Sequence, residues 1–105
     1  MTQPSKQILR DIAYARSGDK GSSANIGVVA YNAKDYEYIL EHLTAPVVQE
    51  YFKPLGAVST IRYELPNLLA LNFVLIGVLD GGGSRSLRID SQGKVLGQAL
   101  LEIEI

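Results

Sequence analysis

The sequence predicts an α+β fold, a two-layer sandwich in which helices cover one face of a mainly antiparallel sheet. Short segments rich in Val, Ile and Tyr flank a central segment whose apolar residues recur at three- and four-residue intervals. Glycine and proline mark the breaks between these segments. We expect the element order ββαβαββ. The 105 residues are enough for one domain with a single core, with residues 1–7 as a polar leader.

The first two elements are predicted to be strands. Residues 8–16 are apolar on both faces, as in an interior strand. Residues 24–31 alternate, and the residues on their more apolar side are Ala24, Ile26, Val28 and Ala30. Asn25 and Gly27 therefore share the opposite side.

A helical pair is predicted next. The apolar residues at helical spacing are Tyr36, Ile39, Leu40, Leu43, Val47, Tyr51 and Phe52. The pattern is interrupted at residues 44–46, where Thr44 can cap a second helix that carries Pro46 in its first turn. Residues 53–56, Lys-Pro-Leu-Gly, then end this helix.

The third strand is predicted over residues 57–64, which are rich in β-branched and aromatic residues and are followed by Pro66. Residues 67–79 fit two structures. Their helical spacing favours a helix that ends at the glycines 81–83, whereas the run 73–76 also suits a buried strand. We favour the helix because an apolar stripe of about 12 residues is long for a strand.

A hairpin is predicted to close the chain, with strands over residues 86–90 and 95–105 and Gly93 in the turn between them. The inward-facing residues of the last strand would be Val95, Gly97, Ala99, Leu101, Ile103 and Ile105. Residues 100–105 contain no proline or lysine. At a sheet edge such a strand would pair with another chain, so we expect a homodimer or a larger assembly.

Composition excludes several functions. The chain has 10 basic and 11 acidic residues, a net charge of −1, so it lacks the basic field of a nucleic-acid binder. It has no cysteine, which excludes disulfides, thiolate zinc sites and iron–sulfur clusters. One histidine then supports neither a metal site nor a cofactor ligand set, and we expect no cofactor. No apolar run suits a membrane span or a secretory signal, so we expect a cytoplasmic protein.

Two polar, glycine-rich segments are candidate sites, residues 16–25 and residues 80–86. The candidate binding residues of the first are Arg16, Ser17, Gly18, Asp19, Lys20, Gly21 and Asn25. Ser84 and Arg85 are the candidates of the second. Glycines let backbone N–H groups turn toward one point, and with nearby cations they would suit a carboxylate or phosphate. Plain connecting loops, with Asp19 and Lys20 solvated, are the alternative.

No self-sufficient catalytic group emerges. His42 is predicted to be an exposed helix residue, and no serine has a histidine at a predictable distance. The six tyrosines are predicted to be core or interface residues. Acid–base work would fall to Asp19, Lys20 or Asp80.

Three strings carry a family resemblance: ARSGDKGSSANIGV at 15–28, RYELPNLLALNF at 62–73 and GGGSRSLR at 81–88. They closely resemble the small C-terminal domain of AtuA-type acyclic terpene utilisation proteins, over residues 8–105. The resemblance implies a ferredoxin-like fold. Ser22 and Ser23 depart from the Asn and Asp expected in relatives.

The resemblance also implies a context. Such a domain follows a large domain or accompanies it as a separate polypeptide, and this chain resembles the separate form. The function implied is an accessory subunit on a large AtuA-like subunit. Its residues 16–25, with Asn67, Asn72 and Arg85, would help bind an acidic, acyl-CoA-type terpenoid or branched-acid substrate. Two other readings stay open: a small enzyme that uses Asp19 or Lys20, and a self-associating structural module.

Overall fold

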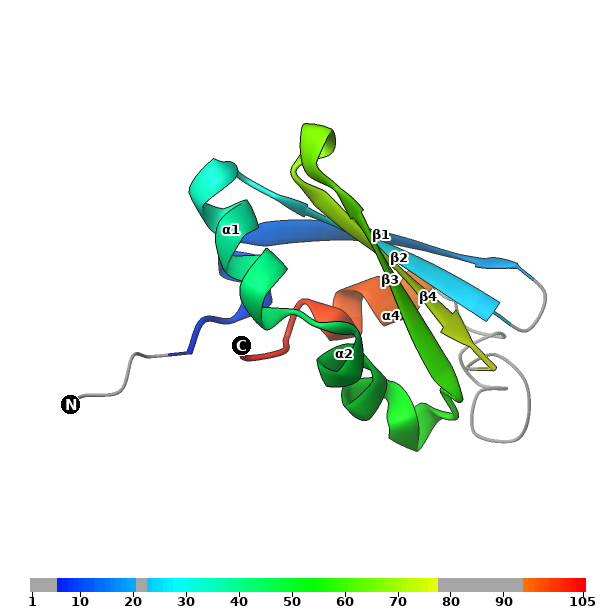
Figure 1. The fold of residues 1–105 in the computed structure, drawn as a ribbon. Coiled ribbons are helices and arrows are strands. Elements are labelled where there is room, and N and C mark those ends of the chain that lie inside the picture. The colour runs from blue at the N-terminus through cyan, green and yellow to red at the C-terminus, as the bar shows by residue number, and fades with distance from the viewer. Residues whose placement is uncertain (1–5, 21–22, 78–93) are drawn as a thin grey trace.

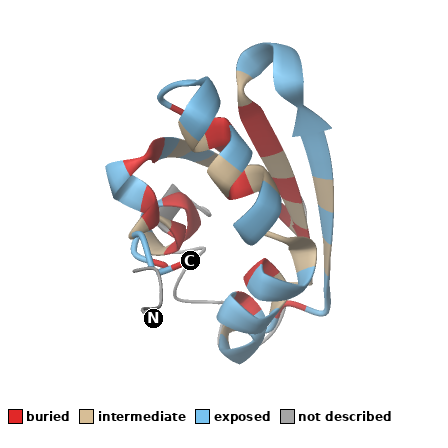
Figure 2. Ribbon diagram, turned by 60° about the vertical axis from the view of Figure 1, so that its left-hand side comes forward, coloured by how far each residue is buried: buried red, intermediate tan, exposed pale blue. Residues whose placement is uncertain are grey.

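A computed structural model describes residues 6–20, 23–77 and 94–105 of the chain. It confirms the α+β class: four antiparallel strands form one sheet in the order β1-β2-β4-β3, and the helices lie on one of its faces (Figures 1 and 2). The strands are β1 (Ala13–Lys20), β2 (Ser23–Ala30), β3 (Ser59–Leu65) and β4 (Ala70–Ile76). The helices are α1 (Ala33–His42), α2 (Ala45–Phe52) and α4 (Lys94–Leu100).

The core lies between the sheet and the helices. Alternate residues of the two central strands are buried on this side, namely Ala24, Ile26, Val28, Leu71, Phe73 and Leu75. The helices meet them with Ile39, Val48, Phe52, Leu96 and Leu100, each at most 1% exposed. Because side chains alternate along a strand, the other residues of each strand lie on the opposite side of the sheet. None of the described helices covers that side, which we call the open face (Figure 2).

The predicted helical pair is confirmed. Asn32 caps α1 by accepting a hydrogen bond from the backbone N–H of Asp35 at 2.8 Å. Thr44 caps α2 in the same way, accepting from Val47 N–H at 3.3 Å, and Pro46 lies in the first turn. After the 3₁₀ turn η2 (Lys53–Leu55), Gly56 takes a φ of 101°, which favours glycine.

The favoured helix over residues 67–79 is wrong, and the alternative strand is right. Residues Pro66–Leu68 form the 3₁₀ turn η3, and the strand β4 follows it. This strand lies between β2 and β3, so both of its edges are hydrogen-bonded and its core side is fully buried. Val74 and Ile76, which are not on the core side, are apolar as well, so the strand lacks the alternation usual for a strand with one open face, and its residues also fit a buried helix.

The C-terminal strand predicted over residues 95–105 is also wrong. Residues Lys94–Leu100 form α4, whose Leu96 and Leu100 are four apart and both enter the core. Beyond the helix, Glu104 forms only an isolated bridge with Ile8. The first hairpin strand, residues 86–90, and the turn at Gly93 lie outside the described residues. The argument for assembly through an edge at residues 100–105 therefore has no basis.

The N-terminal strand begins later than predicted. Residues Leu9–Asp11 form the 3₁₀ turn η1, and β1 starts only at Ala13. The backbone of this turn bonds to the C-terminal segment, with Leu9 N–H donating to the carbonyl of Ile103 at 2.9 Å. The two ends of the described chain meet there, since Gln7 and Ile105 exchange two backbone hydrogen bonds of 2.8 Å. None of the described helices is long and apolar enough to span a bilayer.

Candidate functional site

The predicted binding loop is mostly strand. β1 continues to Lys20 and β2 begins at Ser23, and the two pair along their whole length. Successive residues of this segment therefore face opposite sides of the sheet. Arg16 and Gly18 lie on the open face, whereas Ser17 points to the helices.

The sheet register brings the polar residues of the open face together. Residues directly opposite each other in antiparallel strands share a face. One row across the sheet is Arg16, Gly27, Asn72 and Tyr63. The adjacent row is Gly18, Asn25, Val74 and Ile61. We call these two rows the polar rows.

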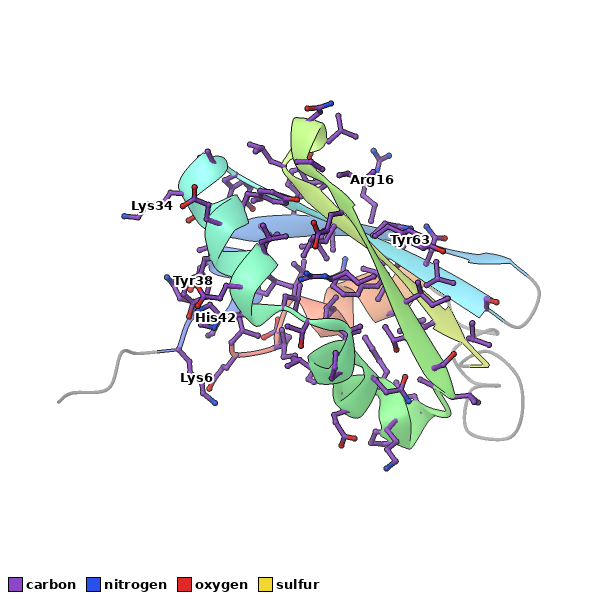
Figure 3. All side chains as sticks on the ribbon, in the orientation of Figure 1. Lys6, Arg16, Lys34, Tyr38, His42 and Tyr63 are labelled. Carbon is purple, nitrogen blue, oxygen red and sulfur yellow. The ribbon has the colours of Figure 1, made fainter. Side chains whose placement is uncertain are left out.

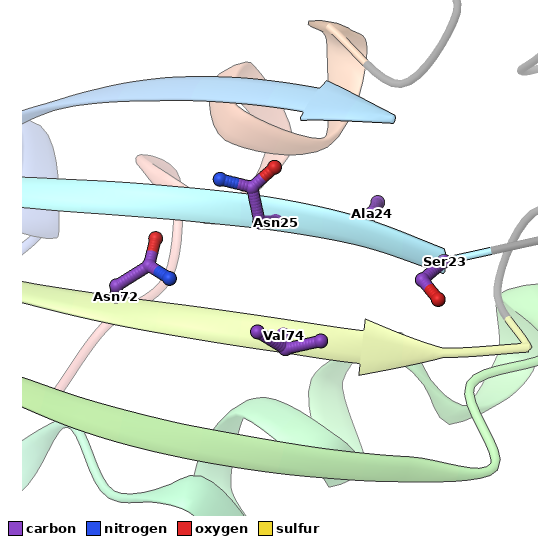
Figure 4. A pocket seen from close by; sticks show the side chains of 5 residues that line it. All are labelled: Ser23, Ala24, Asn25, Asn72 and Val74. Carbon is purple, nitrogen blue, oxygen red and sulfur yellow. The ribbon is translucent and has the colours of Figure 1, made fainter. Parts of the chain in front are cut away.

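Two glycines leave the backbone bare beside two amides. A Cβ on Gly18 would lie 3.6 Å from Oδ1 of Asn25, and one on Gly27 would lie 3.8 Å from Oδ1 of Asn72. Each amide thus leans toward a glycine of the neighbouring strand (Figure 4). A hollow of about 360 Å³ lies here, lined by Ser23, Ala24, Asn25, Asn72 and Val74. Larger side chains at the glycines would occupy the space next to the amides.

The polar rows carry one positive charge. Arg16 is exposed, forms no ion pair within the described part of the chain, and extends from the side of the sheet away from the helices, as does Tyr63 (Figure 3). Tyr63 is 50% exposed. A guanidinium, two amides and a phenol can all donate hydrogen bonds to an anion such as a carboxylate or phosphate. Among its described side chains the open face has no carboxylate and no histidine, and the groups that it presents are hydrogen-bond donors.

In the comparison with protein families, the family described as AtuA ferredoxin-like domain matches residues 7–105. The chain belongs to this family. The match includes both polar rows and confirms the resemblance inferred from the three strings. No curated protein and no solved structure matches the chain.

Some predicted site residues of this AtuA ferredoxin-like domain are not brought to the polar rows. The hydroxyl of Ser17 accepts a hydrogen bond from Gly97 N–H at 3.1 Å, so this residue packs β1 on α4. Asn67 lies in η3, at the turn between β3 and β4, and lines a separate hollow of about 380 Å³ with Glu64, Leu65, Pro66 and Leu68.

Other predicted residues cannot be assigned to the site. Asp19 and Lys20 are the last two residues of β1, and their side chains are not among those described. Gly21, Asp80, Ser84 and Arg85 lie outside the described residues.

Four members of the polar rows are not among the predicted site residues, namely Gly27, Tyr63, Ile61 and Val74, and the first two of them bear on ligand binding. Tyr63 is predicted to be a core or interface tyrosine, although the alternation of Ile61, Tyr63 and Leu65 is visible in residues 59–65. The sequence predicts that Gly27 and Asn25 share a side but does not predict that Gly27 lies beside Asn72. That connection needed the pairing of β2 with β4, which is a long-range contact.

The tyrosines with shifted acidity belong to the helix side of this domain. Burial raises the pKa of Tyr36, the charge of Glu64 raises it further, and Arg62 opposes both effects. Burial also raises the pKa of Tyr51, with a smaller contribution from Glu102. His42 is exposed on α1, beside the ring of Tyr38. None of these groups lies on the open face.

Proposed function

We propose that this AtuA ferredoxin-like domain is an accessory subunit that docks on a large AtuA-like subunit. In this proposal the open face meets the large subunit, and the polar rows complete a shared site. The ligand of that site would be an acidic, acyl-CoA-type terpenoid or branched acid.

The observation that carries the proposal is the convergence of Arg16, Asn25 and Asn72 on a sheet face that no described helix covers. The same face exposes large apolar side chains, namely Tyr14, Ile61, Tyr63, Leu65 and Ile76, which are 38–50% exposed. Large apolar side chains exposed on one face are typical of interfaces with other molecules. The polar groups that would bind a ligand and the apolar side chains that would contact a protein therefore lie on the same face.

The chemistry of the polar rows fits the acidic part of such a ligand. An arginine binds a carboxylate or phosphate through charge-assisted hydrogen bonds, and the asparagine amides add neutral donors. The described side chains of the open face offer no acid–base pair. We therefore infer that the large subunit supplies the catalytic groups and that this chain positions the substrate.

The test is co-expression with the large AtuA-like subunit of the same genome, followed by co-purification and titration of the complex with coenzyme A. We expect a stable complex. Arg16→Ala should weaken coenzyme A binding by about 10- to 100-fold, the value of a hydrogen bond to a charged group. Lys34→Ala is the matched control, because it removes one exposed positive charge from α1, away from the open face (Figure 3).

Three results would contradict the proposal. The two chains could fail to associate while the large protein is fully active alone. Arg16→Ala and Asn72→Ala could leave both coenzyme A binding and association unchanged, as the structural-module reading requires. The isolated chain could turn over a thioester and lose that activity in Asp19→Asn, which would identify a small enzyme instead.

A further inference from the structure

β3 is an outer strand of the sheet, and among the described residues no strand pairs with its outer edge. The direction of the backbone groups at this edge is set by the hydrogen bonds of β4. Ala30 N–H of β2 donates to the carbonyl of Leu69 at 2.8 Å. Because backbone groups along a strand bond alternately to its two neighbours, Leu71 and Phe73 of β4 bond to β2, and Asn72 bonds to its partner Tyr63 of β3. Arg62 and Glu64 of β3 therefore direct their N–H and C=O groups outward.

This edge lacks the usual protection against pairing. Outer strands are commonly protected by lysines, prolines, bulges or a covering helix. β3 contains no lysine and no proline, and it pairs with β4 residue for residue without a bulge. On the open face it exposes Ile61, Tyr63 and Leu65.

The side chains of β3 are self-complementary in one register. If a second copy of β3 runs antiparallel and Tyr63 faces Tyr63, then Arg62 faces Glu64 of the second copy, and Glu64 faces its Arg62. Ile61 then faces Leu65. Shifting the centre to Arg62 or to Glu64 would place like charges opposite each other, which is unfavourable.

The outward backbone groups agree with that register. With Tyr63 at the centre, Arg62 and Glu64 of the two copies exchange N–H and C=O bonds on both sides of the axis. The ladder would end where Thr60 faces Pro66 of the second copy, because proline has no N–H. Glu64 is accessible for this contact, since its side chain is 54% exposed. The Arg62 side chain is 18% exposed and already donates to Glu64 of its own chain, so the two arginines and two glutamates would form one four-charge cluster across the axis.

We propose that two copies of this chain associate through β3, antiparallel and with Tyr63 on the two-fold axis. The two sheets then form one continuous sheet, and the open faces of both copies lie on the same side. The two copies of Tyr63 lie side by side, so the polar row from Arg16 to Tyr63 continues into the second copy. This proposal stands on the geometry of β3 and does not depend on the function proposed above.

Cysteine cross-linking tests the register directly, because the natural chain contains no cysteine. In Tyr63→Cys the two introduced thiols would face each other with Cα atoms about 4.5 Å apart, within the range of a disulfide. We expect mild oxidation to convert most of this variant into a covalent dimer. Ile61→Cys and Leu65→Cys are the matched controls. Each should remain uncross-linked alone, and a mixture of the two should give a disulfide-linked pair.

Sedimentation analysis of the uncross-linked protein tests the association itself. We expect a dimer that Glu64→Arg dissociates, because arginine would then face Arg62 of the second copy. Glu37→Arg, on the exposed side of α1, should remain dimeric. A monomeric natural chain overturns the proposal. So does cross-linking of Ile61→Cys alone as readily as Tyr63→Cys. Loss of coenzyme A binding in Arg16→Ala would support the function proposed for the open face and would leave the β3 proposal unchanged.

Discussion

The hydroxyl of Ser17 accepts a hydrogen bond from the backbone N–H of Gly97 across 3.1 Å. This contact joins β1 to α4 through two residues that are 80 positions apart in the sequence. A Cβ on Gly97 would lie 2.9 Å from the Ser17 oxygen, closer than side chains normally approach. The glycine is therefore required for the close packing of the helix on the strand.

Overpacking of β1 against α4 should cost Gly97→Ala about 1–3 kcal/mol, whereas alanine gains about 1 kcal/mol over glycine in a helix interior. The free energy of unfolding should therefore fall by up to about 2 kcal/mol. Urea unfolding measures the difference. Ser17→Ala in the same chain should relieve part of the strain, whereas Gln98→Ala, exposed on α4, is the neutral control. A more stable Gly97→Ala variant would contradict the packing described.

Arg62 holds the end of α1 against β3. Its guanidinium donates to the carbonyls of Leu40 and Leu43 at 2.9 and 3.0 Å and to the Glu64 carboxylate at 3.0 Å. Arg62→Met should cost about 1–3 kcal/mol of unfolding free energy, because the carbonyls lose a charged partner. Arg16→Met should change stability by less than about 0.5 kcal/mol, as is usual for exposed residues. Equal effects of the two variants in urea unfolding would contradict this role.

Tyr36 carries a buried hydroxyl that has no hydrogen-bond partner among the described residues. Tyr36→Phe should leave stability at pH 7 unchanged or raise it by up to about 1 kcal/mol. Tyr51→Phe is the matched comparison. It should lose about 0.5–1.5 kcal/mol, because the Tyr51 hydroxyl donates to the Ala99 carbonyl at 2.8 Å. A large loss in Tyr36→Phe would show that its hydroxyl has a partner.

The same tyrosine predicts a dependence on pH. The pKa of Tyr36 is raised above the ordinary value of 10.0, so the folded state favours the neutral phenol. Its contribution to stability is complete below pH 10 and is lost as the pH rises above that value through the folded-state pKa. Tyr36→Phe should therefore lose less stability than the natural chain between pH 9 and about pH 11. The urea midpoints of the two proteins, measured across this pH range, give the difference. If both midpoints fell equally with pH, the prediction would be contradicted.

Gly27 lies between Arg16 and Asn72 in the polar rows, and a side chain there would meet only ordinary contacts at 3.8 Å. Gly27→Val should keep or raise stability by about 0.5–1 kcal/mol, because valine suits a strand better than glycine. It should also fill the space beside the Asn72 amide. We expect coenzyme A affinity to fall progressively from Gly27→Ala to Gly27→Val. Unchanged affinity in the larger variant would exclude ligand binding over this glycine.

The elements that the sequence predicts correctly are those with local signals. Thr44 and Pro46 mark the start of α2, and Pro66 ends β3. Residues 70–76 have no such signal, since a segment in which all residues but Asn72 are apolar suits a buried strand and a buried helix alike. What makes this segment a strand is its pairing with β2 and β3, and these long-range contacts cannot be predicted from a local pattern.

The predicted strand over residues 95–105 is wrong for a related reason. Leu96 and Leu100 are four apart, but small and apolar residues between them also produce an alternating pattern. In the candidate site, residue type alone indicates Arg16 and Asn25, and the family resemblance indicates Asn72. Their convergence depends on the register of three strands. Glycine and charge at residues 16–25 predict a loop, although in a sheet they also mark an exposed face with a bare backbone.

The meeting of Gln7 with Ile105 has a mechanical consequence. The bonds that join the two ends run inward in order, from the Gln7–Ile105 pair to Leu9–Ile103 and then Arg10–Leu101. A force that separates the ends would load these bonds one after another, as in opening a zipper, and not all at once. The terminal segment would therefore detach at low force, while the sheet and its open face stay intact.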